Sequence, residues 1–252
     1  MRANHGHSAA ATFVSVVVAL VFCIGAAWLL INRSYVVDQL AVWQYEPSDR
    51  IAALARDASM NSTGTFYFYA GQPVLHDSQD EFNASCPRQE KASAILGCYA
   101  AGVIHVYDVR DERLEAVPAV TAAHEMLHAA WDRMSTQERE DVGVLLNREY
   151  ENLQASTTSD LATRMEYYER TAPDHLDNEL HSIIATETRS ISPELEQHFA
   201  QYFSDRSQVV DLYESYNDRF VQLGQTTDSL KQELERLSND ISTMTDQYNN
   251  TI

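Results

Sequence analysis

The sequence predicts an α+β protein that is anchored to a membrane by one N-terminal helix. Residues 11–31 form a long apolar run without a single charge. Residues 65–69 and 102–109 are rich in β-branched and aromatic side chains, which is typical of strands. From Pro118 onward the apolar residues recur with helical spacing. We therefore expect a transmembrane helix, a domain with a small sheet and a mostly helical C-terminal half, and a long C-terminal helix that resembles a coiled coil.

The composition is that of a folded and strongly acidic chain. Of its 252 residues, 44% are hydrophobic, which is enough for a packed core. Its 37 acidic and 18 basic residues give a formal net charge of −19. Because a polyanion repels phosphate backbones and no basic patch offsets this charge, nucleic acid is excluded as a partner class.

The apolar run at Ala11–Ile31 has the length of a membrane span. As a helix it reaches about 30 Å, which is the thickness of the hydrocarbon layer. Trp28 lies near one end, where interfacial aromatic residues are common. The alternative is a cleaved signal peptide with a small-residue site around Gly25–Ala27. Apolar cores of signal peptides are shorter, at about 7–15 residues, so we expect an anchor.

The orientation of the span follows from what lies on each side of it. Arg2 and Arg33 flank the run, so the positive-inside rule is nearly balanced. Residues 1–10 are too few to fold, whereas everything that can fold comes after the span. We therefore expect a cytoplasmic arm at 1–10 and a single-pass protein of the cell membrane with its domain outside the cytoplasm.

The cysteines agree with this orientation. Cys23 lies within the apolar run, where it acts as a small hydrophobic residue. Cys86 and Cys98 lie twelve positions apart in a loop-rich stretch. Two cysteines in an extracytoplasmic domain predict a disulfide, and two buried thiols are the alternative. The spacing is not CxxC, which argues against a zinc knuckle.

The region between the membrane and the helical half combines helix and strand patterns. A juxtamembrane segment at 34–58 has helical spacing and is broken by Pro47. Thr65–Tyr69 reads TFYFY and predicts a strand, followed by a turn at AGQP. Gly102–Val109 predicts a second strand. We expect the stretch between these two strands to be an irregular loop.

Five helices are expected after these strands. They are a helix from Pro118 to about Met134, one opened by the capping-box pair Ser135 and Glu138 and running toward Leu153, a short one at Leu161–Arg170, one from an Asp174 N-cap to about Ser190, and a long final helix opened by Ser192 and Pro193.

The first of these helices contains the sequence HExxH, as His124-Glu125-Met126-Leu127-His128. Residues i and i+4 lie on one helix face, so both imidazoles can reach one metal ion. Zinc accepts imidazole nitrogen and leaves a position open for water, on which Glu125 can act as general base. The strand at Gly102–Val109 precedes this helix, as expected if an edge strand lines the cleft. An apolar stripe beside the histidines predicts that the helix packs on the domain: Val120, Ala123, Leu127, Ala130 and Met134.

The stretch HEMLHAAW resembles the zincin metallopeptidases, and the resemblance covers about residues 100–190. Trp131 and Met134 stand where metzincins have a glycine and a third histidine, which excludes that branch. Asn178-Glu179-Leu180-His181-Ser182 is similar to the NExxS stretch of thermolysin-like gluzincins. The resemblance implies a zincin-like domain at 59–204 with zinc bound by His124, His128 and Glu179. The family has an aspartate where Ile183 stands, so the partner of the zinc-binding histidine is not identified.

Two alternatives for the third ligand stay open. Glu187 lies two turns after Glu179 on nearly the same helix face, and His181 lies between them.

Zincins also use a tyrosine or histidine to stabilise the oxyanion of the tetrahedral intermediate. Tyr167, Tyr168 and His175 are the candidates by position in the sequence.

Residues 205–252 predict a coiled-coil-like helix. Its seam positions alternate spacings of four and three along about 60 Å of helix. The spacing does not choose the partner, which can be a second copy, another protein or the segment at 34–58. The seam residues are Val209, Tyr213, Tyr216, Phe220, Leu223, Thr227, Leu230, Leu234, Leu237, Ile241, Met244 and Tyr248.

These features favour a membrane-anchored zinc peptidase that acts on peptide or protein substrates. The alternative is a non-enzymatic, membrane-tethered interaction protein, which works through its coiled coil and has an inactive HExxH. The presence of Glu125 favours the enzyme, because a structural metal site does not need a base. The substrate is not encoded in any of these patterns, since specificity depends on the shape of the pocket.

Overall fold

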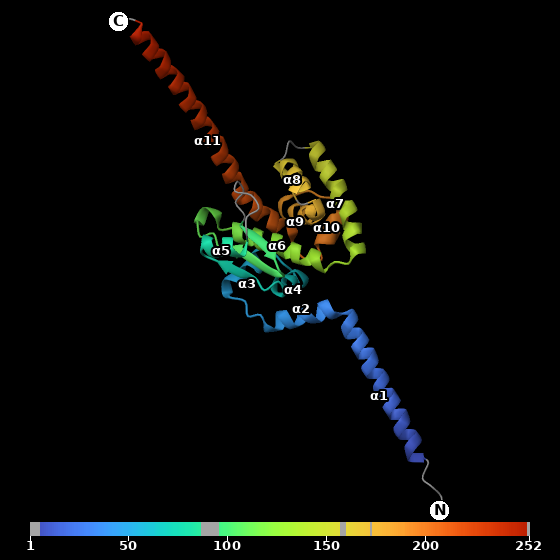
Figure 1. The fold of residues 1–252 in the computed structure, drawn as a ribbon. Helices are drawn as coiled ribbons and strands as arrows, with labels where there is room; N and C mark the ends of the chain where they lie inside the picture. Colours follow the sequence, from blue (N-terminus) through green and yellow to red (C-terminus); the bar gives the residue numbers. More distant parts are fainter. Residues whose placement is uncertain (1–5, 87–95, 157–159, 172, 251–252) are drawn as a thin grey trace, which may run out of the picture.

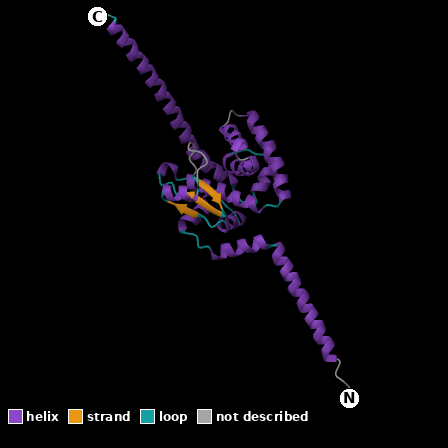
Figure 2. Ribbon diagram, in the orientation of Figure 1, coloured by secondary structure: helices purple, strands orange, loops and turns teal. Residues whose placement is uncertain are grey.

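The computed structural model describes residues 6–86, 96–156, 160–171 and 173–250. A mostly helical domain contains one small sheet (Figure 2), which is compatible with the predicted α+β class. Two long helices, α1 and α11, project from this domain toward opposite sides of the molecule (Figure 1).

The described elements follow one another in this order: α1 (Gly6–Ile31), α2 (Arg33–Gln44), α3 (Asp49–Asp57), α4 (Ser62–Ala70), β1 (Val74–His76), α5 (Gln79–Ser85), β2 (Gly97–Ala100), β3 (Val103–Tyr107), the 3₁₀ turn η1 (Glu112–Leu114), α6 (Val117–Arg133), α7 (Thr136–Ser156), α8 (Asp160–Thr171), the 3₁₀ turn η2 (Pro173–His175), α9 (Leu176–Glu187), α10 (Pro193–Phe199) and α11 (Arg206–Asn249).

Helix α1 contains the predicted span. Its segment Ala11–Ile31 is long and apolar enough to cross a membrane, a property that an N-terminal signal sequence can share. The two helices of the juxtamembrane segment, α2 and α3, are confirmed, and Pro47 lies in the break between them. Helix α3 begins where the Ser48 side chain accepts a hydrogen bond from the backbone N–H of Ile51, which satisfies one free donor of the first turn.

The sheet has three strands in the order β1-β3-β2. Strand β1 runs parallel to β3, and β2 runs antiparallel to it, with Cys98 opposite His105. The strand predicted at Gly102–Val109 is confirmed as β3, but it is the central strand and not an edge strand. The edge next to the HExxH helix belongs to β2, since Gly97 packs directly on the side chain of Glu125.

The strand predicted at Thr65–Tyr69 is wrong, because these residues lie in helix α4. The Asn61 side chain caps this helix by accepting hydrogen bonds from the backbone N–H groups of Thr63 and Gly64, at 2.9 and 3.1 Å. Phe68 is fully buried where α4 packs on α6. The cap and this packing outweigh the β propensity of the aromatic run.

The stretch between the predicted strands is more ordered than the irregular loop we expected. It contains β1, α5 and β2, although residues 87–95 lie outside the described part. A disulfide joins Cys86 at the end of α5 to Cys98 in β2, as predicted. The cross-link fixes β2, whose pattern is too short to be recognised in the sequence, to the helix that precedes it.

Helix α6 runs through the centre of the domain. It packs against α3, α4, α9, the start of α11 and the sheet, and most of its residues from Val117 to Trp131 are buried. The predicted capping box opens α7: the backbone N–H of Ser135 donates to Glu138 at 2.7 Å, and the Ser135 hydroxyl accepts from the N–H of Glu138 at 3.3 Å. Helix α9 starts after His175 and not at the Asp174 cap we predicted, because residues 173–175 form a 3₁₀ turn.

The long final helix begins later than predicted. Ser192 and Pro193 open only the short helix α10, which ends at Phe199. The next residues leave the helix because their backbone pairs with residues 59–61: the N–H of Asn61 donates to the Tyr202 carbonyl at 2.9 Å, and the N–H of Ser204 donates to the Ser59 carbonyl at 2.8 Å. A new cap at Asp205 then opens α11.

Only the first three turns of α11 belong to the domain. Val209 and Val210 are buried, and Arg206 donates to three backbone carbonyls near the end of α9. From Asp218 to Asn250 every residue is exposed. The free part of the helix therefore begins later than the domain boundary predicted at residue 205, and it points away from α2 (Figure 1).

Candidate metal centre

Helix α6 presents His124 and His128 on one face, as the HExxH spacing predicts. Their ring centroids lie 4.8 Å apart, one helical turn from each other. Their side chains are 20% and 11% exposed, so both are mostly enclosed. Such a pair is held in place by the burial of the rest of α6, which leaves the two rings little freedom to move apart.

Helix α9 brings Glu179 to the two histidines. One oxygen of its carboxylate lies 3.8 Å from Nε2 of His124, and the other lies 3.7 Å from Nε2 of His128. These separations are too long for hydrogen bonds, yet one ligand atom from each residue lies within 4.8 Å of the other two. Two imidazole nitrogens and one carboxylate oxygen around one space form a donor set that suits zinc with an open coordination position.

The other two candidates for the third ligand have different partners. Glu187 forms a double salt bridge with Arg164, with distances of 2.6 and 3.0 Å. His181 is fully buried behind the site, where its Nε2 lies 2.9 Å from Nε2 of His198. Of the three candidates named from the sequence, only Glu179 lies with the histidines.

Asn178 supplies a partner for His128 that the sequence did not identify. Its Oδ1 lies 2.9 Å from Nδ1 of His128, and the Ser182 hydroxyl lies 3.3 Å from the same nitrogen. Because an amide oxygen only accepts, Nδ1 of His128 is the donor in this contact, which leaves Nε2, on the side of Glu179, as the nitrogen that could bind a metal ion. Ile183, which stands where the family has an aspartate, is buried in the core. The position of Asn178 directly before Glu179 was the available signal.

Glu125 lies against the edge of β2 that faces away from β3. Its side chain is buried and accepts a hydrogen bond from the backbone N–H of Tyr99. Gly97 makes room for it, since a Cβ there would lie 2.7 Å from a Glu125 carboxylate oxygen. Burial raises the pKa of Glu125 to about 7; His128 and the Tyr99 N–H oppose this rise, and Glu179 adds to it. A carboxylate with such a pKa is suited to exchange a proton near neutral pH.

The two histidines have opposite electrostatic surroundings. Burial lowers the pKa of His124 well below its usual value, with further contributions from His128 and Arg164. Burial also disfavours the charged form of His128, but Glu179 and Glu125 outweigh it and raise its pKa. The carboxylates of Glu179 and Glu125 therefore favour the charged form of His128.

Of the residues considered for oxyanion stabilisation, Tyr168 contacts the cluster. A hydrogen bond joins it to Glu179, and burial together with that carboxylate raises its pKa. His175 is exposed at the start of α9. The side chain of Tyr167 lies outside the described part of the structure.

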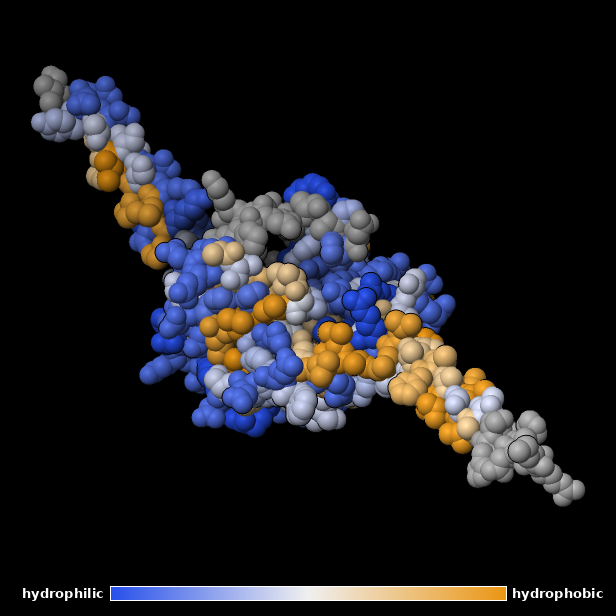
Figure 3. All heavy atoms as spheres, turned by 60° about the horizontal axis from the view of Figure 1, so that its bottom comes forward, coloured by the Kyte–Doolittle hydropathy of each residue, from blue (hydrophilic) through white to orange (hydrophobic). Residues whose placement is uncertain are grey.

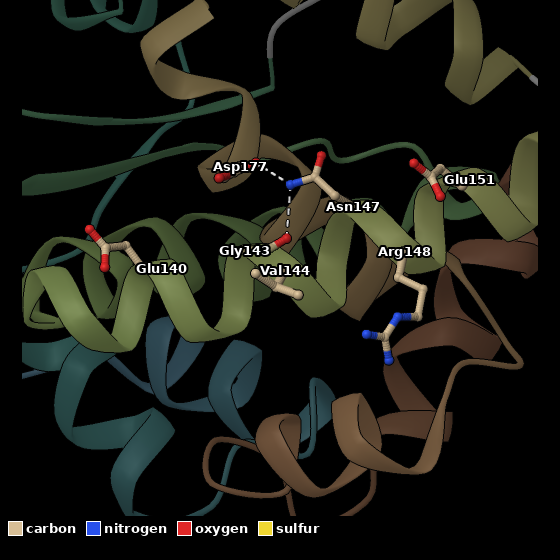
Figure 4. A pocket seen from close by; sticks show the side chains of 7 residues that line it. All are labelled: Glu140, Gly143, Val144, Asn147, Arg148, Glu151 and Asp177. Carbon is tan, nitrogen blue, oxygen red and sulfur yellow. Dashed lines mark hydrogen bonds between the residues drawn. The ribbon is translucent and has the colours of Figure 1, made fainter.

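The start of α9 is braced from its outer side by α7. Asn147 donates to Asp177 at 2.9 Å and to the Gly143 carbonyl at 2.8 Å (Figure 4). These residues line a shallow hollow of about 550 Å³ that contains none of the predicted site residues. The bracing fixes the helical turn from which Asn178 and Glu179 reach the histidines.

No protein-family model matches the sequence, and neither a curated protein nor a solved structure matches the chain.

Proposed function

We propose that this chain is a membrane-anchored, zinc-dependent peptidase of the zincin type, with a gluzincin-like ligand set. One observation carries the proposal: α6 and α9 bring His124, His128 and Glu179 around one space, with Glu125 directly beside them. When bound, zinc would acidify a water molecule and polarise the carbonyl of a peptide bond.

The residues of the chain would transfer the proton, orient the metal ligands and stabilise the oxyanion. Glu125 would take the proton of the attacking water and later deliver it to the leaving amine, since its carboxylate is buried and has a raised pKa. Asn178 would hold the ring of His128 in the tautomer that keeps Nε2 free. Tyr168 would orient Glu179 and lies near enough to be the candidate for oxyanion stabilisation.

The edge of β2 supports a peptide as the substrate. In the described part of the sheet β2 is an edge strand that pairs with β3, and on its outer edge the Tyr99 N–H is bound by Glu125. An extended peptide can pair with such an edge by backbone hydrogen bonds. Because Glu125 binds the Tyr99 N–H at this edge, a paired peptide would pass beside the proposed base.

Metal analysis of the purified full chain tests the proposal. We expect about one zinc per chain, lost in His124→Ala, together with hydrolysis of a mixed peptide library by the zinc-loaded protein. A chain that binds no metal after incubation with zinc would contradict the proposal. Zinc binding without hydrolysis would instead favour a non-enzymatic interaction protein, which the exposed apolar seam of α11 makes the second candidate.

A further inference from the structure

Helix α2 has an outward face that no acidic residue interrupts. Val36, Leu40 and Trp43 follow helical spacing on this face; Val36 is half-buried, whereas Leu40 is exposed and Trp43 is 85% exposed. The only acidic residue of α2, Asp38, is turned inward and buried. In a chain with a net charge of −19, an exposed apolar face without a carboxylate needs a specific explanation.

This face continues the apolar surface of α1. Only Asn32 separates the two helices, and the chain bends there (Figure 1). Trp28 near the end of α1 lines a groove together with Val36, Leu40 and Trp43. Figure 3 shows the apolar surface passing from α1 onto the adjoining underside of the domain.

We propose that α2 lies in the membrane–water interface, with its Val36, Leu40 and Trp43 face in the lipid headgroup region. The position of α2 in the chain indicates that lipid covers this face, because a helix that starts one residue after a membrane span lies at the depth of the headgroups. Tryptophan and tyrosine are the residues preferred at that depth, and Trp28, Tyr35 and Trp43 are all present here. Arg33, the only basic residue of α2, is exposed at its start, where phosphates are within reach.

The same helix is attached firmly to the domain. Arg133 makes a double salt bridge with Asp38, at 2.7 and 2.8 Å, and both side chains are largely buried. Arg133 also donates to the Tyr99 hydroxyl of β2 at 3.1 Å and to the Ala129 carbonyl at 2.7 Å. A bidentate pair of this kind fixes the angle as well as the distance between two elements. The orientation of α2 on the lipid therefore sets the orientation of the domain.

Arg133 is the last residue of α6, which carries the candidate metal centre. With a helical rise of 1.5 Å per residue, His128 lies about 7.5 Å and His124 about 13.5 Å along the axis from it. On the proposed peptidase function, this arrangement holds the site close to the bilayer. The substrate class would then be membrane-proximal segments of other proteins.

Depth measurement on the full chain in phosphatidylcholine vesicles tests the docking of α2. A fluorophore is attached at Trp43→Cys or, separately, at Leu40→Cys in a Cys23→Ser background, and is quenched by phosphatidylcholine that carries a spin label near the headgroup. Val144→Cys on α7, which is also exposed, serves as the matched control. We expect quenching at least about three-fold stronger at positions 40 and 43 than at 144.

Equal quenching at positions 43 and 144 would overturn the proposal. So would a Trp43→Cys dimer that forms by disulfide while lipid quenching is absent, since it would place a second copy on this face. The measurement needs neither metal nor hydrolysis. Its failure is therefore distinct from failure of the peptidase proposal, which zinc content and activity report.

Discussion

Helix α6 and the outer part of helix α11 both carry apolar residues at helical spacing, but they lie in opposite surroundings. The stripe of α6 is enclosed by four helices and the sheet, so His124, Glu125 and His128 are held against fixed partners. The seam of α11 is exposed from Phe220 onward. Periodicity therefore indicates that a helix has an edge to bury, but the surface that covers this edge depends on the rest of the fold.

The comparison suggests that the two helices serve different functions. An enclosed helix can position charged and polar groups because its neighbours limit their motion, which is what a reaction requires. An exposed seam cannot hold reactive side chains in fixed positions by itself. It is stabilised only when its apolar residues pack against another surface. On the proposed function, α6 with α9 would carry the chemistry, and the outer part of α11 would mediate assembly.

The largest effect is expected for Glu125→Gln. The amide is close in shape but cannot take a proton, so hydrolysis should fall by about 10²- to 10⁴-fold while zinc content stays at the wild-type level. Hydrolysis of a peptide library read by mass spectrometry, with zinc content measured on the same sample, gives both quantities. Glu140→Gln on the exposed face of α7 is the control for loss of one carboxylate. Full activity of Glu125→Gln would remove the assigned base.

The next effect separates the two candidate glutamates of α9. Glu179→Ala should weaken zinc binding by more than about 100-fold, which exceeds the usual effect of losing a partner outside the ligand set. Glu187→Ala should change zinc affinity little, because Glu187 is paired with Arg164. Zinc titration against a competing chelator measures both, and thermal unfolding shows whether each variant is folded. The reverse order of affinities would make Glu187 the ligand.

A smaller effect is expected at Asn178. Asn178→Ala removes the acceptor for the His128 Nδ1–H and should weaken zinc binding by about 10- to 100-fold, whereas Asn178→Asp keeps an acceptor and should retain binding. The same zinc titration applies. Asn147→Ala is the matched control, because it loosens the start of α9 without touching His128. An equal loss in Asn147→Ala would mean that Asn178 acts only through the position of α9.

The features that could be predicted from the sequence are those set by nearby residues. The limits of α6 follow from Pro118 and from the capping box of Ser135 and Glu138, each of which acts within one turn. The meeting of His124 with His128 follows from helical spacing alone. The meeting of both with Glu179 depended on resemblance to a family, because no local rule relates α6 to α9.

The features that could not be predicted depend on distant residues. Thr65–Tyr69 has strand propensity, but the cap at Asn61 and the burial of Phe68 against α6 make it a helix. The break between α10 and α11 depends on hydrogen bonds to residues 59–61. The contact of Glu125 with Tyr99 depends on the place of β2 in the sheet, which the disulfide to Cys86 helps to fix. Each of these joins segments that are far apart in the chain.

The smallest effect on the metal centre, and the largest on assembly, is expected when residues 218–252 are removed. The truncated chain keeps Arg206, Val209 and Val210, which hold the first turns of α11 in the domain. Zinc content should therefore be unchanged. Truncation immediately after Arg206 is expected to be different, because it would remove Val209 and Val210 from the core and destabilise the domain.

The assembly state reports what the seam binds. Helix α11 is exposed from Asp218 on and points away from α2, which argues against folding back onto the juxtamembrane segment. A second copy is the simplest partner, since anchoring in one membrane would concentrate the chains. We expect light scattering in mild detergent to show an oligomer for the full chain and fewer subunits per particle for the chain that ends at Asn217.

Substitutions on α11 separate the seam from the rest of the helix. The double variant Leu230→Gln with Leu237→Gln, on the seam, should reduce the number of subunits as the truncation does. The double variant Gln232→Ala with Asn239→Ala, on the opposite face, should not. A full chain that is monomeric in detergent would assign the seam to another protein and leave the site predictions untouched.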